Sequence, residues 1–84
     1  MFLVAVKSSA ERDLSRLDVQ AQRRCEHAID ALRNDPRPHG CKKLVGSSHA
    51  YRLRVGDYRI VYTVEDAIQI VSVHRVRHRS DVYR

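Results

Sequence analysis

The sequence predicts one α+β domain over residues 1–84: an N-terminal strand, a two-helix hairpin and an antiparallel three-stranded meander, with the helices on one sheet face. The element order is β-α-α-β-β-β. Three observations predict it. A chain of 84 residues buries a single small core. Apolar residues have helical spacing as far as Leu32, and from Leu44 onward they alternate with polar residues as in strands.

Residues 2–7 predict the first strand, because bulky and β-branched side chains follow one another without a breaker. The next four residues, Ser8 to Glu11, have the form of a capping box. In this motif the Ser8 hydroxyl accepts from the Glu11 backbone N–H, and the Glu11 carboxylate reaches back to the Ser8 N–H. The apolar residues that follow share one helix face: Ala10, Leu14 and Leu17.

Asp18 predicts the N-cap of a second helix that runs to Leu32 or Arg33. Pro36 and Pro38 follow, and proline cannot continue a helix. The predicted buried stripe is Ala21, Cys25, Ala28, Ile29 and Leu32, with Arg23, Arg24 and Asp30 turned outward. The two helices, joined at Asp18, form a helical hairpin.

Three strands are predicted in the second half, at residues 50–55, 58–64 and 68–73. Gly56-Asp57 suits a two-residue turn, because Gly56 readily adopts a positive φ. That turn places Arg54 directly opposite Arg59. Side chains alternate between the faces of a strand, so one apolar face covers the helices. It consists of Tyr51, Leu53, Val55, Tyr58, Ile60 and Tyr62.

For the second hairpin we prefer a three-residue loop at residues 65–67. It pairs Tyr62 with Ile70 and Arg59 with Val73, and it keeps Ile68 on the core face. Val73 and Arg75 then join the opposite face. A two-residue loop would invert the strand and bury Gln69.

Charge is the strongest functional signal in the composition. The chain has sixteen Lys and Arg residues and ten Asp and Glu residues, which gives a net charge of +6. Thirteen of the sixteen basic residues are Arg. The planar guanidinium group donates two parallel hydrogen bonds to a phosphate. Arg52, Arg54 and Arg59 share the sheet face away from the helices, where like charges repel unless an anion joins them. A polyanionic partner is therefore predicted; the alternative is a solvated basic surface.

Several classes are disfavoured by the same composition. No apolar run approaches the ~20 residues of a membrane span, and the apolar start is too short for a signal peptide, so a cytoplasmic protein is expected. Cys25 and Cys41 are too few for a disulfide framework. His39 and Cys41 form only a lone pair of metal ligands, so we expect no metal and no cofactor.

Four segments together resemble a known family. They are Asp35-Pro36, residues 43–46, residues 51–62 and residues 73–83. In these segments the chain resembles the RelE family of toxins from bacterial toxin–antitoxin systems, which are ribosome-dependent mRNA endonucleases. The resemblance spans nearly the whole chain and is specific for the RelE/ParE superfamily.

The resemblance implies a mechanism and partners. The toxin enters the ribosomal A site and promotes attack by an mRNA 2′-hydroxyl on the adjacent phosphate. The absence of metal-ligand spacing in this sequence argues for cleavage without a metal. A cognate RelB-like antitoxin neutralises it. The implied catalytic residues are Arg52, Arg54, Arg59, Arg77 (with Arg79 as its near alternative) and Tyr83. The residues assigned to RNA contacts are Lys42, Lys43, Arg23, Arg24 and Arg75.

One departure from the family affects the mechanism. Well-studied members have lysine on the first strand of the site, where this chain has Arg52 and Arg54. Arginine stays protonated, so neither residue can be the general base. His78 is the first candidate for that role and Tyr83 the second. Two alternatives stay open: a ParE-like toxin of DNA gyrase, and an inactive homologue that serves as a binding module.

Overall fold

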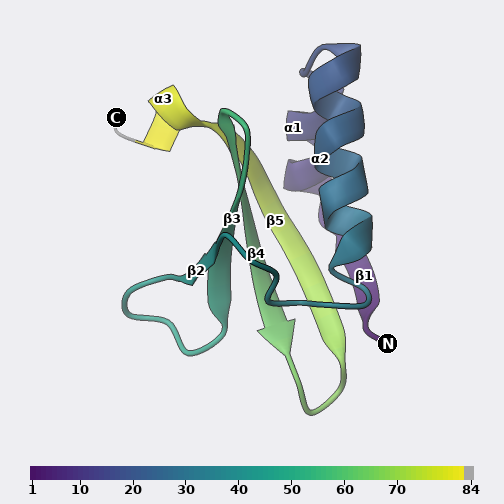
Figure 1. The fold of residues 1–84 in the computed structure, drawn as a ribbon, viewed down its shortest axis with the longest axis vertical. Coiled ribbons are helices and arrows are strands. Elements are labelled where there is room, and N and C mark those ends of the chain that lie inside the picture. Colours follow the sequence, from purple (N-terminus) through teal and green to yellow (C-terminus); the bar gives the residue numbers. More distant parts are fainter. Residues whose placement is uncertain (83–84) are drawn as a thin grey trace.

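Residues 1–82, which the computed structural model describes, form a five-stranded sheet with the strand order β1-β5-β4-β3-β2. Helices α1 and α2 lie together on one side of this sheet (Figure 1). The predicted α+β class and the placement of both helices on one face are therefore confirmed. In chain order the elements are β1 (Leu3–Val6), α1 (Ser8–Ser15), α2 (Val19–Ala31), β2 (Cys41–Lys43), β3 (Ala50–Val55), β4 (Tyr58–Glu65), β5 (Ile70–His78) and α3 (Arg79–Val82).

The sheet differs in detail from the predicted meander. Strands β3, β4 and β5 form the predicted antiparallel meander, but β1 adds to β5 in parallel. Strand β2, which the sequence did not predict, adds to β3 at the other edge. It has only three residues, so it has almost no alternating pattern of its own.

The core fills the space between the two helices and the sheet. The first hairpin has the predicted register, with Arg54 opposite Arg59 and Leu53 opposite Ile60. Because of this register, Leu53 and Ile60 face α2 and are buried. The buried apolar residues are Ala10, Leu14, Cys25, Ile29, Leu32, Leu53, Ile60, Tyr62, Val64, Val71, Val73 and Val76.

The predicted register of the second hairpin is wrong. Tyr62 pairs with Val73, and Arg59 pairs with Arg77. The turn is one residue longer than expected, over residues 66–69, and Gln69 adopts a left-handed φ of 54°. Ile68, expected in the core, lies in this turn and is 59% exposed.

A register shift beside Val61 and Tyr62 leaves His74 without a partner in β4. This β-bulge changes the phase of β5, so Val71, Val73 and Val76 all face the core. Val73 is therefore fully buried and not on the arginine-bearing face, contrary to our expectation. Strand β5 also extends to His78, five residues beyond the predicted end.

Helix α1 does not begin with the predicted capping box. Lys7 is the N-cap and makes no side-chain cap, and the Glu11 backbone N–H donates to the Lys7 carbonyl at 2.9 Å. Ser8 is already the first helical residue. The neighbouring Ser9 hydroxyl instead donates to the His74 carbonyl of β5 at 2.7 Å. This tertiary contact ties the start of α1 to β5 without capping the helix.

Helix α2 follows the prediction closely. The Asp18 carboxylate accepts from the Ala21 backbone N–H at 2.8 Å, which confirms the N-cap. Cys25 and Ile29 are buried, while Arg23 and Arg24 are exposed. Among residues 1–82, no helix is long and apolar enough to cross a membrane.

Candidate nucleic-acid interface

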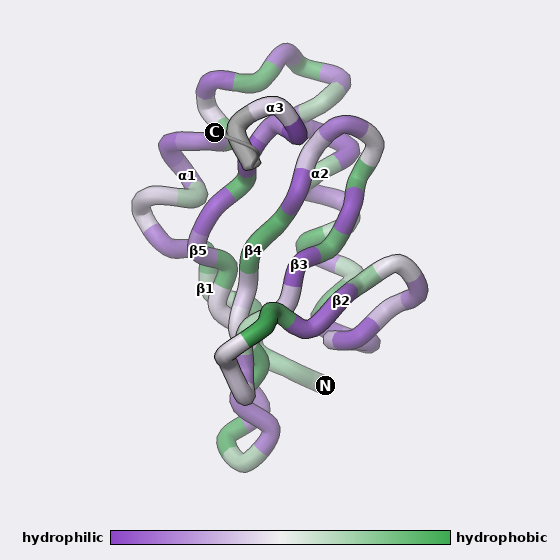
Figure 2. Tube along the Cα trace, turned by 90° about the vertical axis from the view of Figure 1, so that its left-hand side faces the viewer, coloured by the Kyte–Doolittle hydropathy of each residue, from purple (hydrophilic) through white to green (hydrophobic). Residues whose placement is uncertain are grey.

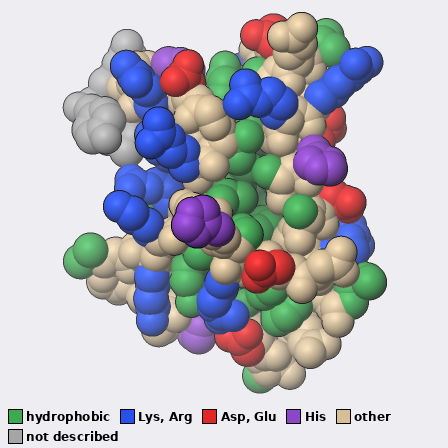
Figure 3. Space-filling view, viewed as in Figure 1, with side chains coloured by type: hydrophobic (Ala, Val, Ile, Leu, Met, Phe, Trp, Pro, Cys, Tyr) green, Lys and Arg blue, Asp and Glu red, His purple; other side chains and the backbone are tan. Residues whose placement is uncertain are grey.

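The sheet face away from the helices carries a cluster of cations from three strands. A pocket of about 230 Å³ is lined by Gly40, Lys42, Arg52, Arg54 and Arg59, and we call it the arginine pocket. Figure 2 looks onto this face and shows hydrophilic and hydrophobic residues alternating along the strands. In Figure 3, Lys and Arg side chains gather along the side of the molecule that carries β2 and β3.

Strand register brings these cations together. Lys42 lies opposite Arg52 across β2 and β3, and Arg54 lies opposite Arg59 across β3 and β4. Residues paired in this way point to the same face of a sheet. Gly40 precedes β2 and has a φ of +94°, a conformation that glycine adopts without strain. The arginine pocket therefore follows from the alternation that buries Leu53 and Ile60 on the other face.

Carboxylates do not neutralise the arginine pocket within the described part of the chain. Among the side chains of residues 1–80, ion pairs join Arg33 to Asp30, Arg37 to Asp66, and Arg75 to Asp13. The Arg59 guanidinium donates instead to the carbonyl oxygens of Tyr58 at 3.1 Å and Gly56 at 3.4 Å. Its positive charge is thus held in place and stays uncompensated, which favours an anionic ligand.

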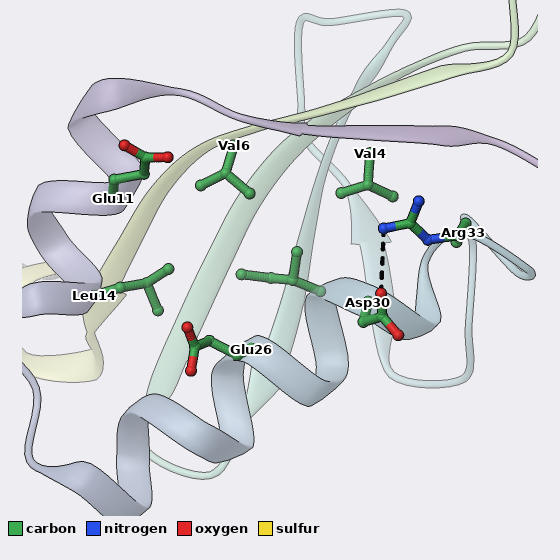
Figure 4. A pocket seen from close by; sticks show the side chains of 8 residues that line it. Val4, Val6, Glu11, Leu14, Glu26, Asp30 and Arg33 are labelled. Atoms are coloured by element: carbon green, nitrogen blue, oxygen red, sulfur yellow. Dashed lines mark hydrogen bonds and ion pairs between the residues drawn. The ribbon is translucent and has the colours of Figure 1, made fainter.

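Acidic groups gather on the opposite side of the molecule. A groove of about 270 Å³ lies between β1, α1 and α2. Figure 4 shows Val4, Val6 and Leu14 lining this groove together with Glu11, Glu26 and the Asp30–Arg33 ion pair. Because of these carboxylates, the groove is a poor site for a polyanion.

Arg77 joins the same face as the arginine pocket. It lies opposite Arg59 across β4 and β5, so Arg54, Arg59 and Arg77 form one row across three strands. The predicted grouping of Arg52, Arg54, Arg59 and Arg77 is therefore what the structure brings together. Lys42 belongs with them.

Arg75 has a different environment from the one expected. Its Nε and Nη2 donate to the Asp13 carboxylate of α1 at 2.8 and 3.3 Å, and Asp13 also accepts from the Val76 backbone N–H at 2.9 Å. Burial alone would raise the pKa of Asp13, but the hydrogen bonds from Arg75 and Val76 outweigh it and hold this pKa below its ordinary value. Arg75 thus fastens β5 to α1, and it does not join the arginine pocket.

His78 lies on the other face of the sheet from Arg59 and Arg77. It is opposite Tyr58, and the two rings meet edge to face with centroids 5.3 Å apart. The backbone N–H of Ser80 donates to His78 Nδ1 at 3.2 Å, and the Ser80 hydroxyl lies 2.9 Å from the same nitrogen. A backbone N–H can only donate, so the proton of the neutral ring is on Nε2.

The other predicted RNA contacts are dispersed. Lys43 lies opposite Tyr51, on the helix-side face. Arg23 and Arg24 belong to α2, and the Arg24 guanidinium lies so close to Gly56 that an added Cβ there would come within 2.6 Å of it.

The C-terminal predictions are only partly covered by the structure. Arg79 begins α3, and its backbone N–H donates to the Asp57 carbonyl at 2.7 Å. Tyr83 lies outside the described residues.

Sequence reasoning missed the contacts that hold the segment before β2. Arg37 donates to both Asp66 oxygens, at 3.1 and 2.6 Å, and to the Tyr51 hydroxyl at 2.9 Å. The buried Tyr62 hydroxyl donates to the Pro36 carbonyl at 2.8 Å. These contacts fix the proline segment that places Gly40 at the arginine pocket. Nothing in the local sequence indicates them, because the partners are distant along the chain.

Comparison with known proteins identifies the chain. The family model described as the ParE toxin of type II toxin–antitoxin systems matches residues 4–83. The chain is a toxin of the RelE/ParE superfamily. Toxin RelE from Mycobacterium tuberculosis is 33% identical over 82 residues, which cover 96% of this chain and 84% of that protein. Toxin RelG from the same organism is 32% identical over 87 residues, covering 99% and 97%.

The fold of this RelE/ParE toxin agrees with solved structures. The toxin superposes on a chain of the archaeal RelE–RelB complex from Pyrococcus horikoshii with a TM-score of 0.83, at 26% identity and covering 93% and 94% of the two chains. The resemblance found in the sequence is thereby confirmed at the level of the superfamily. All residues that line the arginine pocket fall within the family match.

Proposed function

We propose that this RelE-type toxin is an endoribonuclease that cleaves mRNA in the ribosomal A site and is neutralised by a RelB-like antitoxin. The observation that carries the proposal is the arginine pocket. It presents three guanidinium groups from adjacent strands, and no carboxylate among the described side chains pairs with them. Such a site matches the geometry and charge of a phosphodiester.

The chemistry requires charge stabilisation more than any other contribution. An mRNA 2′-hydroxyl loses its proton to a base and attacks the adjacent phosphorus, and the bond to the 5′-oxygen breaks. The products are a 2′,3′-cyclic phosphate and a 5′-hydroxyl that has gained a proton from an acid. The extra negative charge develops on the phosphate oxygens, where Arg52, Arg54 and Arg59 donate, with Arg77 reaching from β5.

We propose that these guanidinium groups do the electrostatic work that a divalent cation does in other nucleases. The number of cations around one pocket supports this assignment. Cleavage is then expected to continue in excess EDTA once ribosome integrity is maintained with non-chelated polyamines. Complete loss of cleavage under those conditions, on ribosomes that still hold mRNA, would contradict it.

For proton transfer we favour Tyr83 over His78. His78 faces away from Arg59 and Arg77. Its Nδ1 accepts from the Ser80 backbone N–H, so the other ring nitrogen, Nε2, already carries the proton and has no free lone pair to act as a base. Tyr83→Phe is therefore expected to slow cleavage strongly, while His78→Ala slows it less. If His78→Ala cleaves mRNA as slowly as Tyr83→Phe at an unchanged unfolding midpoint, His78 is the better candidate for the general base.

The antitoxin proposal draws on similar proteins. The Pyrococcus horikoshii structure is a RelE–RelB complex, as is that of a related pair from Methanococcus jannaschii. An exposed basic pocket attracts an acidic segment of such a partner. A RelB-like protein encoded beside this toxin is expected to restore translation when added in equimolar amount.

The decisive experiment adds purified toxin to translating ribosomes and maps the new mRNA ends. Cuts within A-site codons, with a cyclic phosphate on the upstream fragment, are the expected result. Intact mRNA in the presence of folded toxin would overturn the proposal.

The family match gives a second candidate. Its description names ParE toxins. The second candidate is therefore a ParE-like toxin, which we would expect to inhibit DNA gyrase through protein contacts. Cells expressing such a toxin would accumulate DNA breaks and keep their mRNA whole. Cells that grow normally would indicate an inactive homologue that only binds a partner.

A further inference from the structure

A second basic pocket lies at the edge of the sheet, beside the last residues of β5. It has a volume of about 240 Å³ and is lined by the end of α1 together with β4 and β5. We call it the edge pocket. The residues that matter for the argument are Arg16, Tyr58, Arg77 and His78.

The edge pocket exists because β1 is shorter than β5. Pairing of β1 with β5 ends at Val6 and Val73, which leaves the rest of β5 without a neighbouring strand on that side. Helix α1 covers this edge: the Ser9 hydroxyl donates to the His74 carbonyl, and Asp13 accepts from the Val76 N–H. The pocket lies beside these contacts and is lined by Arg16 and Leu17 at the end of α1 and by Arg77 and His78 at the end of β5.

The charge of the edge pocket is positive. It contains one carboxylate, Asp13, against three guanidinium groups. Arg75 neutralises Asp13 through two hydrogen bonds. Arg16 and Arg77 are exposed, and neither forms an ion pair with any side chain among residues 1–80. Two cations are thus available to an anion.

The remaining wall suits a nucleotide better than a simple ion. His78 Nδ1 is occupied by Ser80, which leaves Nε2–H as the hydrogen-bond donor of the ring. Tyr58 contacts this ring edge to face and adds a flat apolar surface. Guanidinium groups bind the phosphates of single-stranded RNA, and aromatic side chains stack with its bases.

Arg77 connects the two basic pockets. It lines the edge pocket and lies opposite Arg59, which lines the arginine pocket. The row from Arg54 to Arg77 crosses two strand spacings, about 10 Å, which is more than a single phosphate occupies. We propose that the edge pocket binds a further phosphodiester of the same RNA strand, which passes around the free edge of β5 at Arg77 from the arginine pocket on the other face of the sheet. This inference rests on the proposed RNA-cleaving function.

Arg16→Ala tests the edge pocket, and Arg12→Ala is its matched control. Both substitutions remove one exposed arginine from α1, but only Arg16 lines the pocket. Fluorescence anisotropy measures binding of non-cleavable 2′-O-methyl RNA, as a dinucleotide with one phosphodiester and as a hexanucleotide. We expect Arg16→Ala to weaken hexanucleotide binding about tenfold and to reduce the slope of log affinity against log salt by about 0.7. Its dinucleotide affinity should match that of Arg12→Ala.

Each contrary outcome has a separate meaning. Equal hexanucleotide affinity for Arg16→Ala and Arg12→Ala, with binding still lost in Arg59→Ala, overturns the edge pocket and leaves the proposed function intact. An Arg16→Ala defect seen only on ribosomes also overturns it, because the phosphate then belongs to ribosomal RNA. Failure of the wild-type toxin to bind either oligonucleotide overturns the edge pocket as a site for RNA, whereas the proposed function stands or falls separately on cleavage of mRNA on translating ribosomes.

Discussion

Ile60 and Arg59 are neighbours on β4, but they belong to two different environments. Ile60 is fully buried between the sheet and the helices. Arg59 points the other way, into a pocket shared with cations of β2 and β3. The same alternating pattern therefore builds the core with one set of residues and the candidate site with the other. A substitution on one face is expected to change stability, and one on the other face to change RNA binding.

The arginines themselves divide in a similar way. Arg75 and Arg37 each meet a carboxylate and join segments far apart in the chain, α1 to β5 and the proline segment to the β4–β5 turn. Arg54 and Arg59 instead lie directly opposite each other on the neighbouring strands β3 and β4. Like charges in that position destabilise a sheet. The anionic ligand proposed for the arginine pocket would turn this repulsion into attraction.

The largest stability effect is expected from Ile60→Ala. Removing a fully buried aliphatic side chain leaves a cavity and lowers the free energy of unfolding by about 2–5 kcal/mol. Urea denaturation followed by circular dichroism measures this loss. Val61→Ala, on the same strand but facing the open side, should lose less than half as much. Equal losses would show that the two faces do not differ in packing.

Asp13→Asn is expected to come next, at about 1–3 kcal/mol, because the carboxylate accepts three hydrogen bonds and its side chain is 10% exposed. Asp30→Asn is the control. Asp30 pairs with Arg33 on the surface of α2 and its side chain is 75% exposed, so we expect a change below about 0.5 kcal/mol. Similar unfolding midpoints for the two variants would contradict the structural role of Asp13.

Acid should distinguish the wild-type toxin from Asp13→Asn. The pKa of Asp13 is lowered in the folded state, so its contribution to stability is present above its unfolded pKa of about 4 and is lost as pH falls through the lower folded value. The wild-type toxin should therefore lose more stability than Asp13→Asn between about pH 5 and pH 2. Parallel pH profiles of the urea midpoint would rule this out.

The smallest effect concerns repulsion in the arginine pocket. Salt screens the charges of Arg54, Arg59 and Arg77, so raising the ionic strength should stabilise the wild-type fold by roughly 0.2–1 kcal/mol. Arg59→Gln should gain less from salt, because the middle charge of the row is absent. Urea midpoints at low and high salt measure this; the same gain in both proteins would mean that the row is not repulsive.

Local signals predicted the first hairpin and the face of its arginines. A two-residue turn at Gly56-Asp57 leaves one register, and alternation then assigns every side chain from Ala50 to Glu65 to a face. The prediction of Asp18 as N-cap succeeded for the same reason, since its partner Ala21 is three residues away.

Tertiary contacts decided the features that the sequence did not predict. The bulge at His74 changes the phase of β5, and no turn residue marks it. It occurs where β1 ends and α1 takes over the edge of β5, through the bond from Ser9 to the His74 carbonyl. Because of the bulge, Val73 on one side of it and Val76 on the other both face the core. Strand β2 likewise exists only through its pairing with β3.

The most direct test of the arginine pocket compares Arg59→Ala with Arg12→Ala on translating ribosomes, with the unfolding midpoint of each protein measured alongside. We expect Arg59→Ala to cleave mRNA about 10²–10³-fold more slowly at an unchanged or higher midpoint, because a donor to the transition-state oxyanion is lost. Arg12→Ala should cleave at the wild-type rate. Wild-type cleavage by folded Arg59→Ala would contradict the assignment of this pocket to the RNA phosphate.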